Sequence, residues 1–387
     1  MSGAGATVVV GIGNTDYARD WVLCRSSGAR TDGYGYAATA FTRALSDAGI
    51  TKDDVDGLYV GAPLAYERTA EVLGLDVKWA STGDASQALQ DAAAAITMGW
   101  ADCVALVYGN DQRSAGTAYG GPGASYGDQF LSYVYYEPWG FTSQGALYAL
   151  LARRYLAVNG LDERLLGEVA VAQRMHAQLN PDAVMRSELT PDDYLAARMI
   201  VEPLRLFDYT IVNDGGVALL VVSDDFARSR GLSRRGAHIT AFGRHDMNRE
   251  ATSLAPRLLD FYHTGHAAAA RSVYESASVG PEEIATIQIY DSFSVHVPLM
   301  LAGLGFTTDD GVGDFIMSGA LRPGGRLPTN TSGGHLSESY MQGWGHLAEC
   351  VRQVRGEAGA RQVDRARYVQ YASDVAGKVF SAIFEKA

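Results

Sequence analysis

The stretch Val8-Val9-Val10-Gly11-Ile12-Gly13, near the N-terminus, decides how the rest of the chain is interpreted. A short apolar run bounded by glycine is typical of a buried strand. An amphipathic pattern follows it, with Ala37, Ala40, Phe41 and Ala44 on one face, and Gly49 stands where a helix would end. A buried strand followed by an amphipathic helix is the repeating element of an α/β protein.

The same order of elements is predicted twice along the chain. The first copy continues with a strand at 58–61, a helix at 85–98, and strands at 103–108 and 217–222. The second copy consists of a strand at 238–242, helices near 265–278, 294–304 and 337–355, and strands at 284–290, 368–371 and 379–384. Each copy follows the order β-α-β-α-β-β, which indicates a duplicated α/β unit. Alternating strands and helices predict mainly parallel sheets that are covered on both faces.

A long insertion interrupts the first copy. We therefore expect two halves, 1–235 and 236–387, with an inserted loop domain of about 110–205 in the first. Insertions of this length inside an α/β unit are usually functional. Aromatic side chains are dense in it: Tyr119, Tyr126, Tyr133, Tyr135, Tyr136, Trp139 and Phe141. They suit an apolar substrate pocket or a subunit interface, and equally a packed cap without a ligand.

The composition excludes several classes of protein. The 387 residues include 32 basic and 44 acidic side chains, a net charge of −12, which makes a general nucleic-acid binder improbable. No apolar run is long enough for a membrane span, and the N-terminus does not resemble a signal peptide. Three cysteines without a CxxC pair provide neither a disulfide framework nor a zinc site, so we expect a reducing, cytoplasmic setting.

Three short motifs suggest a dinucleotide site, a nucleophile elbow and a metal site, but the residues around them do not fit these functions. Gly11-Ile12-Gly13 lacks the third glycine of a dinucleotide fingerprint, because Asp16 occupies that position. Gly123–Gly127 matches GxSxG, but it lacks the strand and helix that flank a nucleophile elbow. His263 and His266 have no carboxylate or cysteine motif beside them. We therefore expect no cofactor and no metal site.

Two segments near the C-terminus carry a resemblance to a known family. They are Asn330-Thr-Ser-Gly-Gly334 and Gln353-Val-Arg-Gly-Glu-Ala-Gly-Ala-Arg-Gln-Val363. This pattern resembles the C-terminal half of thiolases, and is most similar to the lipid-transfer or sterol carrier protein x branch. The resemblance implies a thiolase-like fold, with two βαβαββ halves in five αβαβα layers and a loop domain inserted in the first.

The sequence departs from thiolases at each catalytic position. Where the family has its nucleophilic cysteine, at the start of a helix, counting back from Gly99 gives Thr82. The family motif NEAF or HDCF reads Tyr290-Asp291-Ser292-Phe293, and the GHP histidine corresponds to Tyr340. Paired tyrosines without the cysteine resemble the thiolase-like steroid side-chain aldolases of actinobacteria.

That resemblance implies a carbon–carbon lyase acting on a steroid acyl-CoA thioester. A retro-aldol reaction would cleave a β-hydroxyacyl-CoA into a 17-keto steroid and propionyl-CoA, with coenzyme A as part of the substrate. The resemblance also implies two partners. One is a second copy of the chain, in a homodimer with 103–108 as the edge strand, and the other is an accessory protein with OB-fold and zinc-ribbon domains. Two alternatives stay open: acyl transfer or Claisen chemistry through Thr82, and a non-catalytic acyl-CoA or sterol carrier.

Two phenols can supply both the base and the acid of a retro-aldol step. We expect Tyr290 and Tyr340 to act in these roles, in an order that the sequence leaves open. Because the ordinary pKa of tyrosine is near 10, something must stabilise the phenolate. The turn that leads into the next helix offers backbone N–H groups for this purpose. The residues expected around the substrate are Asn330, Gly333, Gly334, His335, His346 and Thr82, with His296 also near in sequence.

Overall fold

The computed structural model describes residues 7–24, 31–117, 137–140, 143–247 and 259–386. The first half contains β1 (Thr7–Asn14), α1 (Tyr17–Leu23), α2 (Gly33–Ala48), β2 (Gly57–Gly61), α3 (Tyr66–Leu73), β3 (Trp79–Gly83), α4 (Ala85–Thr97), β4 (Cys103–Asn110), β7 (Gly215–Ser223) and α9 (Asp224–Ser229). Between β4 and β7 lie α6 (Gln144–Val158), α7 (Arg164–Gln178), α8 (Pro191–Ala196), β5 (Met199–Val201) and β6 (Leu204–Arg205).

The second half begins at β8 (Ala237–Asp246). It continues with α11 (His263–Ala277), β9 (Ile284–Ile289), α12 (His296–Gly303), α13 (Val312–Met317), α14 (Gly334–Ser337), α15 (Trp344–Arg355), β10 (Tyr368–Ser373) and β11 (Lys378–Lys386). No helix in the described part of the chain combines the length and apolar character needed to cross a bilayer.

The two halves share one pattern of strand pairing. In the first, β2 runs parallel to β4, β4 antiparallel to β7, and β7 antiparallel to β1. In the second, β9 runs parallel to β10, β10 antiparallel to β11, and β11 antiparallel to β8. The predicted duplication is thus visible in the topology. The expectation of mainly parallel sheets was wrong, because the last strand of each half returns antiparallel beside its first strand.

One nine-stranded sheet, in the order β3-β2-β4-β7-β1-β8-β11-β10-β9, joins the halves. The junction is short, since β1 and β8 pair only at Val8–His238 and Val9–Ala237. Strand β4 lies inside this sheet, between β2 and β7, and is therefore not the free edge that the sequence analysis expected. The edge of the first half is β3, whose side chains are partly or fully exposed.

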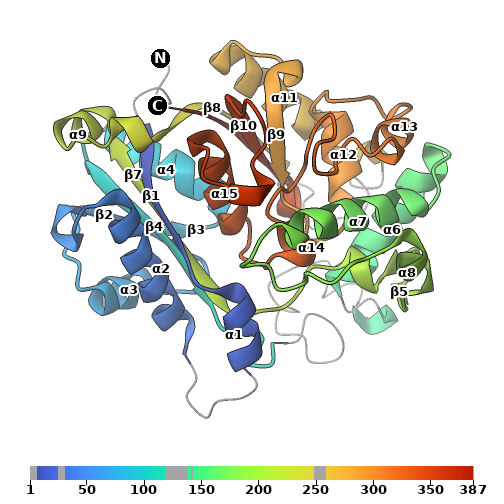
Figure 1. The fold of residues 1–387 in the computed structure, drawn as a ribbon, viewed down its shortest axis with the longest axis horizontal. Helices are drawn as coiled ribbons and strands as arrows, with labels where there is room; N and C mark the ends of the chain where they lie inside the picture. The colour runs from blue at the N-terminus through green and yellow to red at the C-terminus, as the bar shows by residue number, and fades with distance from the viewer. Residues whose placement is uncertain (1–6, 25–30, 118–136, 141–142, 248–258, 387) are drawn as a thin grey trace.

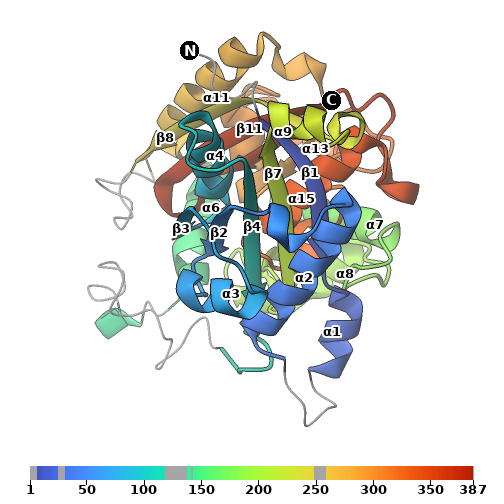
Figure 2. The same cartoon turned by 90° about the vertical axis from the view of Figure 1, so that its left-hand side faces the viewer.

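Helices cover the two halves in five layers (Figure 1). Helices α2 and α3 lie on the outer face of the first half, and Figure 2 shows them in front of its strands. Helix α4 packs on the opposite face, and α15 contacts strands of both halves. Helix α11 covers the outer face of β8 and β11. The thiolase-like layering is confirmed, and α15 belongs to its central layer.

Close packing explains the two glycines of the first strand. A methyl group at Gly11 would lie 2.5 Å from the carbonyl oxygen of Ala44, and one at Gly13 would lie 2.2 Å from that of Ala40. These glycines therefore let α2 approach β1 directly. Their role in the fold is packing, which accounts for the incomplete dinucleotide motif.

The helix predicted near 337–355 is interrupted in the structure. Helix α14 ends at Ser337 and α15 begins at Trp344, with Gln342 and Gly343 at φ of 46° and 87° in the left-handed region. Such angles end a helix, and glycine adopts them without a steric penalty. Tyr340 lies inside this break, on a turn instead of a helix face.

Candidate active site

The two tyrosines meet where the second half faces the first. Tyr290 directly follows β9, and its hydroxyl lies 3.2 Å from that of Tyr340, within hydrogen-bonding distance. The backbone N–H of Tyr290 donates to the carbonyl of Ala372 at 2.8 Å, which continues the register of β9 with β10. The residues that replaced the family's catalytic groups are therefore brought together, fifty positions apart in the chain.

Burial distinguishes the two phenols. Tyr290 is only 4% exposed, whereas Tyr340 is partly exposed. Burial, reinforced by the neighbouring hydroxyl of Tyr340, raises the pKa of Tyr290 well above its ordinary value of 10.0. The uncharged form of Tyr290 is therefore favoured, and either hydroxyl can be the donor of the hydrogen bond between them.

His335 packs against both tyrosine rings. Its ring centroid is 4.7 Å from that of Tyr290 and 5.0 Å from that of Tyr340, both edge to face. The backbone N–H of Gly343 donates to His335 Nε2 at 3.0 Å, so this nitrogen carries no proton. Burial and the nearby histidines lower the pKa of His335 well below 6.5. The ring is therefore neutral, with its proton on Nδ1.

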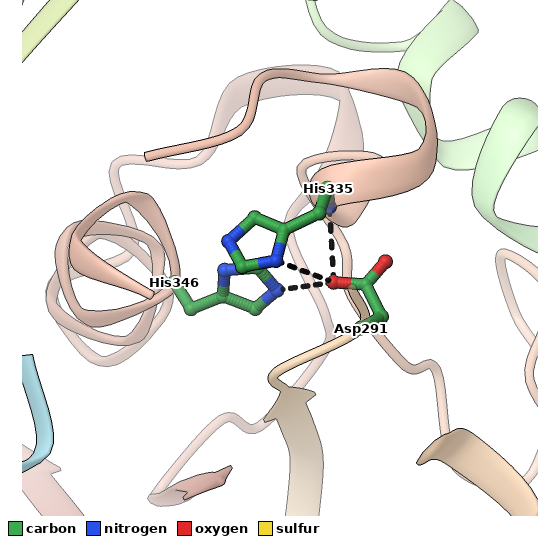
Figure 3. Close-up of side chains that lie close together, drawn as sticks. All are labelled: Asp291, His335 and His346. Atoms are coloured by element: carbon green, nitrogen blue, oxygen red, sulfur yellow. Dashed lines mark hydrogen bonds and ion pairs between the residues drawn. The ribbon is translucent and has the colours of Figure 1, made fainter. Parts of the chain in front are cut away.

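Asp291 is the anchor of the histidines (Figure 3). Its carboxylate is fully buried and accepts from the backbone N–H groups of His335, at 3.0 Å, and Leu336, at 3.3 Å. Nε2 of His346 donates to the same carboxylate at 2.9 Å, and His335 Nδ1 lies 3.5 Å from it. The N–H groups expected to stabilise a phenolate are thus directed at Asp291 instead.

Asp291, His335 and His346 also have the ligand atoms of a metal site, all within 4.8 Å of one another. To bind a metal through Nδ1, neutral His335 would have to carry its proton on Nε2. That proton would point at the N–H of Gly343, which donates to the same nitrogen. The hydrogen-bond pattern therefore fits a closed polar network and opposes a metal.

The glycine-rich loop at 330–334 fixes the shape of the site, and the side-chain amide of its Asn330 is bonded within the fold. Asn330 occupies a left-handed conformation, and its side-chain amide exchanges two hydrogen bonds with the backbone of Ile289, at 2.6 and 3.0 Å. A methyl group at Gly334 would lie 2.5 Å from an Asp291 oxygen, and one at Gly333 would lie 2.7 Å from Ala177. Asn330, Gly333 and Gly334 thus fix the turn that presents His335.

Residues of the first half hold the tyrosine turn. The backbone N–H of Tyr340 donates to the side chain of Asn213 at 2.7 Å, and its carbonyl accepts from Asn110 at 3.4 Å. The sequence analysis missed both asparagines. The only signal for Asn213 was its place just before Asp214-Gly215-Gly216 at the start of β7.

Thr82 is not at the position that the sequence analysis assigned to it. It lies in β3 with an exposed side chain, and its hydroxyl donates to the carbonyl of Val60 at 3.0 Å. The helix begins three residues later at Ala85, which lies near Gly343 and the ring of Tyr290. The position counted back from Gly99 lies three residues before the helix, which begins after the Asp84 cap.

Other motifs from the sequence have separate outcomes. The Gly123–Gly127 motif and most of the insertion's aromatic residues lie outside the described residues. Trp139 is described and is 85% exposed. His263 and His266 pair with different carboxylates, Asp309 and Asp374, so they do not share a ligand.

Comparison with known proteins places this site in a family. Residues 250–384 match the thiolase C-terminal domain-like family. The chain is 33% identical to the 17-hydroxy-3-oxo-4-pregnene-20-carboxyl-CoA lyase of Mycobacterium tuberculosis over 373 residues, 91% of this chain and 92% of that protein. The chain belongs to the thiolase-like steroid side-chain-cleaving aldolases. The family resemblance stated from the sequence is confirmed.

Two further matches agree with this membership. A steroid side-chain-cleaving aldolase of Thermomonospora curvata is 32% identical over 369 residues, 91% of each protein. The solved Ltp2-ChsH2(DUF35) aldolase superposes with a TM-score of 0.84 at 30% identity, over 99% of this chain and 98% of that one. Human mitochondrial 3-ketoacyl-CoA thiolase shares the fold, with a TM-score of 0.72 at 13% identity.

Proposed function

We propose that this chain is a retro-aldol lyase that cleaves the side chain of a steroid β-hydroxyacyl-CoA, releasing a 17-keto steroid and propionyl-CoA. The observation that carries the proposal is the contact of the Tyr290 and Tyr340 hydroxyls at 3.2 Å. Two relatives of nearly full length, named as a steroid acyl-CoA lyase and a steroid side-chain-cleaving aldolase, support the substrate class.

The roles proposed for the two phenols rest on their difference in burial. Tyr340, on the exposed side of the pair, takes the proton of the substrate β-hydroxyl as its phenolate. Tyr290 stabilises that phenolate by donating its hydroxyl proton, since burial makes ionisation of Tyr290 itself costly. The neutral His335 ring packs edge-on against both phenols and keeps them in contact.

Bond cleavage then needs only one proton to cross the site. As the β-carbon becomes a ketone, the electrons of the Cα–Cβ bond pass into the thioester enolate. Tyr290 protonates the enolate carbon, which is a far stronger base than a phenolate. The proton held by Tyr340 passes to Tyr290 across their hydrogen bond and restores the starting state. Neither a covalent acyl-enzyme nor a cofactor is needed, and coenzyme A takes part only as part of the substrate.

Acyl transfer through Thr82 has little support. Its hydroxyl is exposed on an edge strand and is bonded to a backbone carbonyl. The partner of this hydroxyl is thus a carbonyl oxygen and not the side-chain base that a threonine nucleophile requires.

The same proposal includes assembly and setting. We propose a homodimer paired through β3, because an edge strand with one unpaired side is a ready template for a second copy. An accessory OB-fold and zinc-ribbon protein is proposed by analogy with the Ltp2-ChsH2(DUF35) aldolase. A reducing cytoplasm suits the three free cysteines. We retain 1–235 and 236–387, with the insertion at about 110–205, as the proposed domains.

The test is product analysis. The chain, alone and co-expressed with an accessory protein of that type, is incubated with a steroid CoA thioester that carries a tertiary β-hydroxyl. The proposal expects a 17-keto steroid together with propionyl-CoA by mass spectrometry. Free CoA without any ketone, or no turnover in either preparation, would contradict it.

A further inference from the structure

A second chain of hydrogen bonds lies next to the tyrosine pair. Ser292 Oγ is 3.0 Å from His296 Nε2, and His296 Nδ1 is 2.6 Å from Asp374 Oδ1. Ser292 follows β9 and Asp374 follows β10, which are parallel neighbours, so both residues lie at the same end of the sheet as Tyr290. The proposed retro-aldol mechanism uses none of the three.

The positions of the protons in this series of hydrogen bonds follow from Asp374. Its carboxylate is fully buried and faces His266 Nε2 at 3.1 Å as well as His296. Burial alone would raise the pKa of Asp374, but the two histidines outweigh it and hold the pKa below its ordinary value. A carboxylate only accepts, so His296 carries its proton on Nδ1. Nε2 of His296 is then free to accept the hydroxyl proton of Ser292.

This is the arrangement in which a histidine activates a serine. His296 and Asp374 are fully buried, while Ser292 keeps 6% of its surface exposed. Ser292 is therefore the exposed end of this series of hydrogen bonds. The rings of His296 and Tyr290 stand edge to face with centroids 6.4 Å apart. The histidine therefore lies close to Tyr290, and Ser292 follows Tyr290 by two residues in the chain.

A nearby serine provides a contrast. Ser294, two residues further on, donates its hydroxyl to Asp208 at 2.5 Å, and Tyr194 donates to the same carboxylate at 2.9 Å. Its hydroxyl is paired with a carboxylate and has no histidine to relay its proton. Ser294 is thus a matched control for Ser292.

We propose that Ser292, His296 and Asp374 form a nucleophilic triad that hydrolyses an acyl-CoA thioester bound at the tyrosine pair, as a second activity beside carbon–carbon cleavage. This rests on the proposed function only in that the site binds an acyl-CoA. Ser292 Oγ attacks the thioester carbonyl while its proton moves to His296 Nε2. The C–S bond breaks, and the same proton passes to the departing sulfur.

Water completes the reaction. The acyl group is now an ester of Ser292, and water attacks this ester while giving a proton to His296 Nε2. The C–O bond breaks and the proton returns to Oγ. The products are one carboxylic acid and one CoA thiol, and the enzyme is unchanged.

The first test measures thiol release from propionyl-CoA, which has no β-hydroxyl and so cannot undergo the retro-aldol step. We expect Ser292→Ala and His296→Gln to release thiol at least about tenfold more slowly than the unmodified chain. Ser294→Ala should release it at a rate within about twofold of that chain. Ketone formation from the β-hydroxyacyl-CoA is followed in parallel. Thiol release without ketone would leave the triad standing and refute the aldolase; equal thiol release by Ser292→Ala and the unmodified chain overturns the triad.

The second test does not depend on folding of a variant or on CoA binding. The unmodified chain is treated with a small fluorophosphonate, which reacts with activated serines, and its peptides are analysed by mass spectrometry. The triad predicts one adduct, on Ser292. An unlabelled chain, or an adduct on another serine, overturns the proposal.

Discussion

Glu338 makes the stability of this protein depend on pH in an unusual direction. The side chain is buried two residues before Tyr340, where it accepts from Ser332 at 2.6 Å and Asn180 at 3.0 Å. Burial, and then the negative charge of Glu349, raise the pKa of Glu338 from 4.5 to about 7. Glu338→Gln removes the charge and keeps both hydrogen bonds, because the Ser332 hydroxyl can turn to accept.

The sign and size of the effect follow from the raised pKa. Between pH 4.5 and 7 the folded chain binds more protons at Glu338 than the unfolded chain does, so stability falls as the pH rises through this window. A change from 4.5 to about 7 corresponds to about 3 kcal/mol. Relative to the natural chain, Glu338→Gln should therefore gain up to about 3 kcal/mol in unfolding free energy between about pH 5 and about pH 8.

Urea unfolding of both proteins across this range measures the gain. Glu349→Gln is the control, because the Arg361 guanidinium overcomes the burial of Glu349 and lowers its pKa. That carboxylate stabilises the fold above its unfolded pKa and loses this contribution as the pH falls, so the control should be destabilised most at neutral pH. An unchanged difference between Glu338→Gln and the natural chain at all pH values would refute the reasoning.

Three further outcomes are expected. Asp291→Asn should lose about 2–3 kcal/mol of unfolding free energy in urea, because its amide would face N–H donors; a loss under about 0.5 kcal/mol would contradict the network. Prolonged dialysis of the chain alone, without the proposed zinc-ribbon partner, against EDTA should leave its ketone formation unchanged, and a loss restored by zinc would mean that Asp291, His335 and His346 hold a metal. Thr82→Lys, on the exposed edge strand, should convert the proposed dimer to monomer by light scattering; an unchanged mass would exclude β3 as the interface.

Much of the fold could be predicted from local patterns. The buried strands and the helices α4 and α11 lie within a few residues of their predicted bounds, because each depends on short-range periodicity. Helix α2 ends before Gly49, the predicted cap. Strand direction and the sheet edge were wrong for a common reason. Both depend on which strands pair across the chain, and periodicity contains no information about pairing partners.

The site residues also divide into those that a local motif marks and those that depend on long-range contacts. Tyr290 and Tyr340 were selected because each replaces a residue of a family motif, and the structure places their hydroxyls in contact. Thr82 was assigned to the start of a helix although it precedes the predicted helix by three residues, and the structure places it in a strand. Asn213, Asn110 and Asp374 act through contacts more than seventy residues away in sequence, so no local motif marks them.

The central claim is that the two phenols exchange protons with the substrate, and Tyr→Phe variants test it most directly. Each removes one hydroxyl and keeps the ring that packs against His335. We expect Tyr290→Phe and Tyr340→Phe each to lose at least about a hundredfold in kcat for ketone formation, with unfolding in urea nearly unchanged. The double variant should be little worse than the worse single one, and Thr82→Ala should be nearly as active as the natural chain. If both phenylalanine variants keep more than about a third of the activity, the paired-phenol mechanism is wrong.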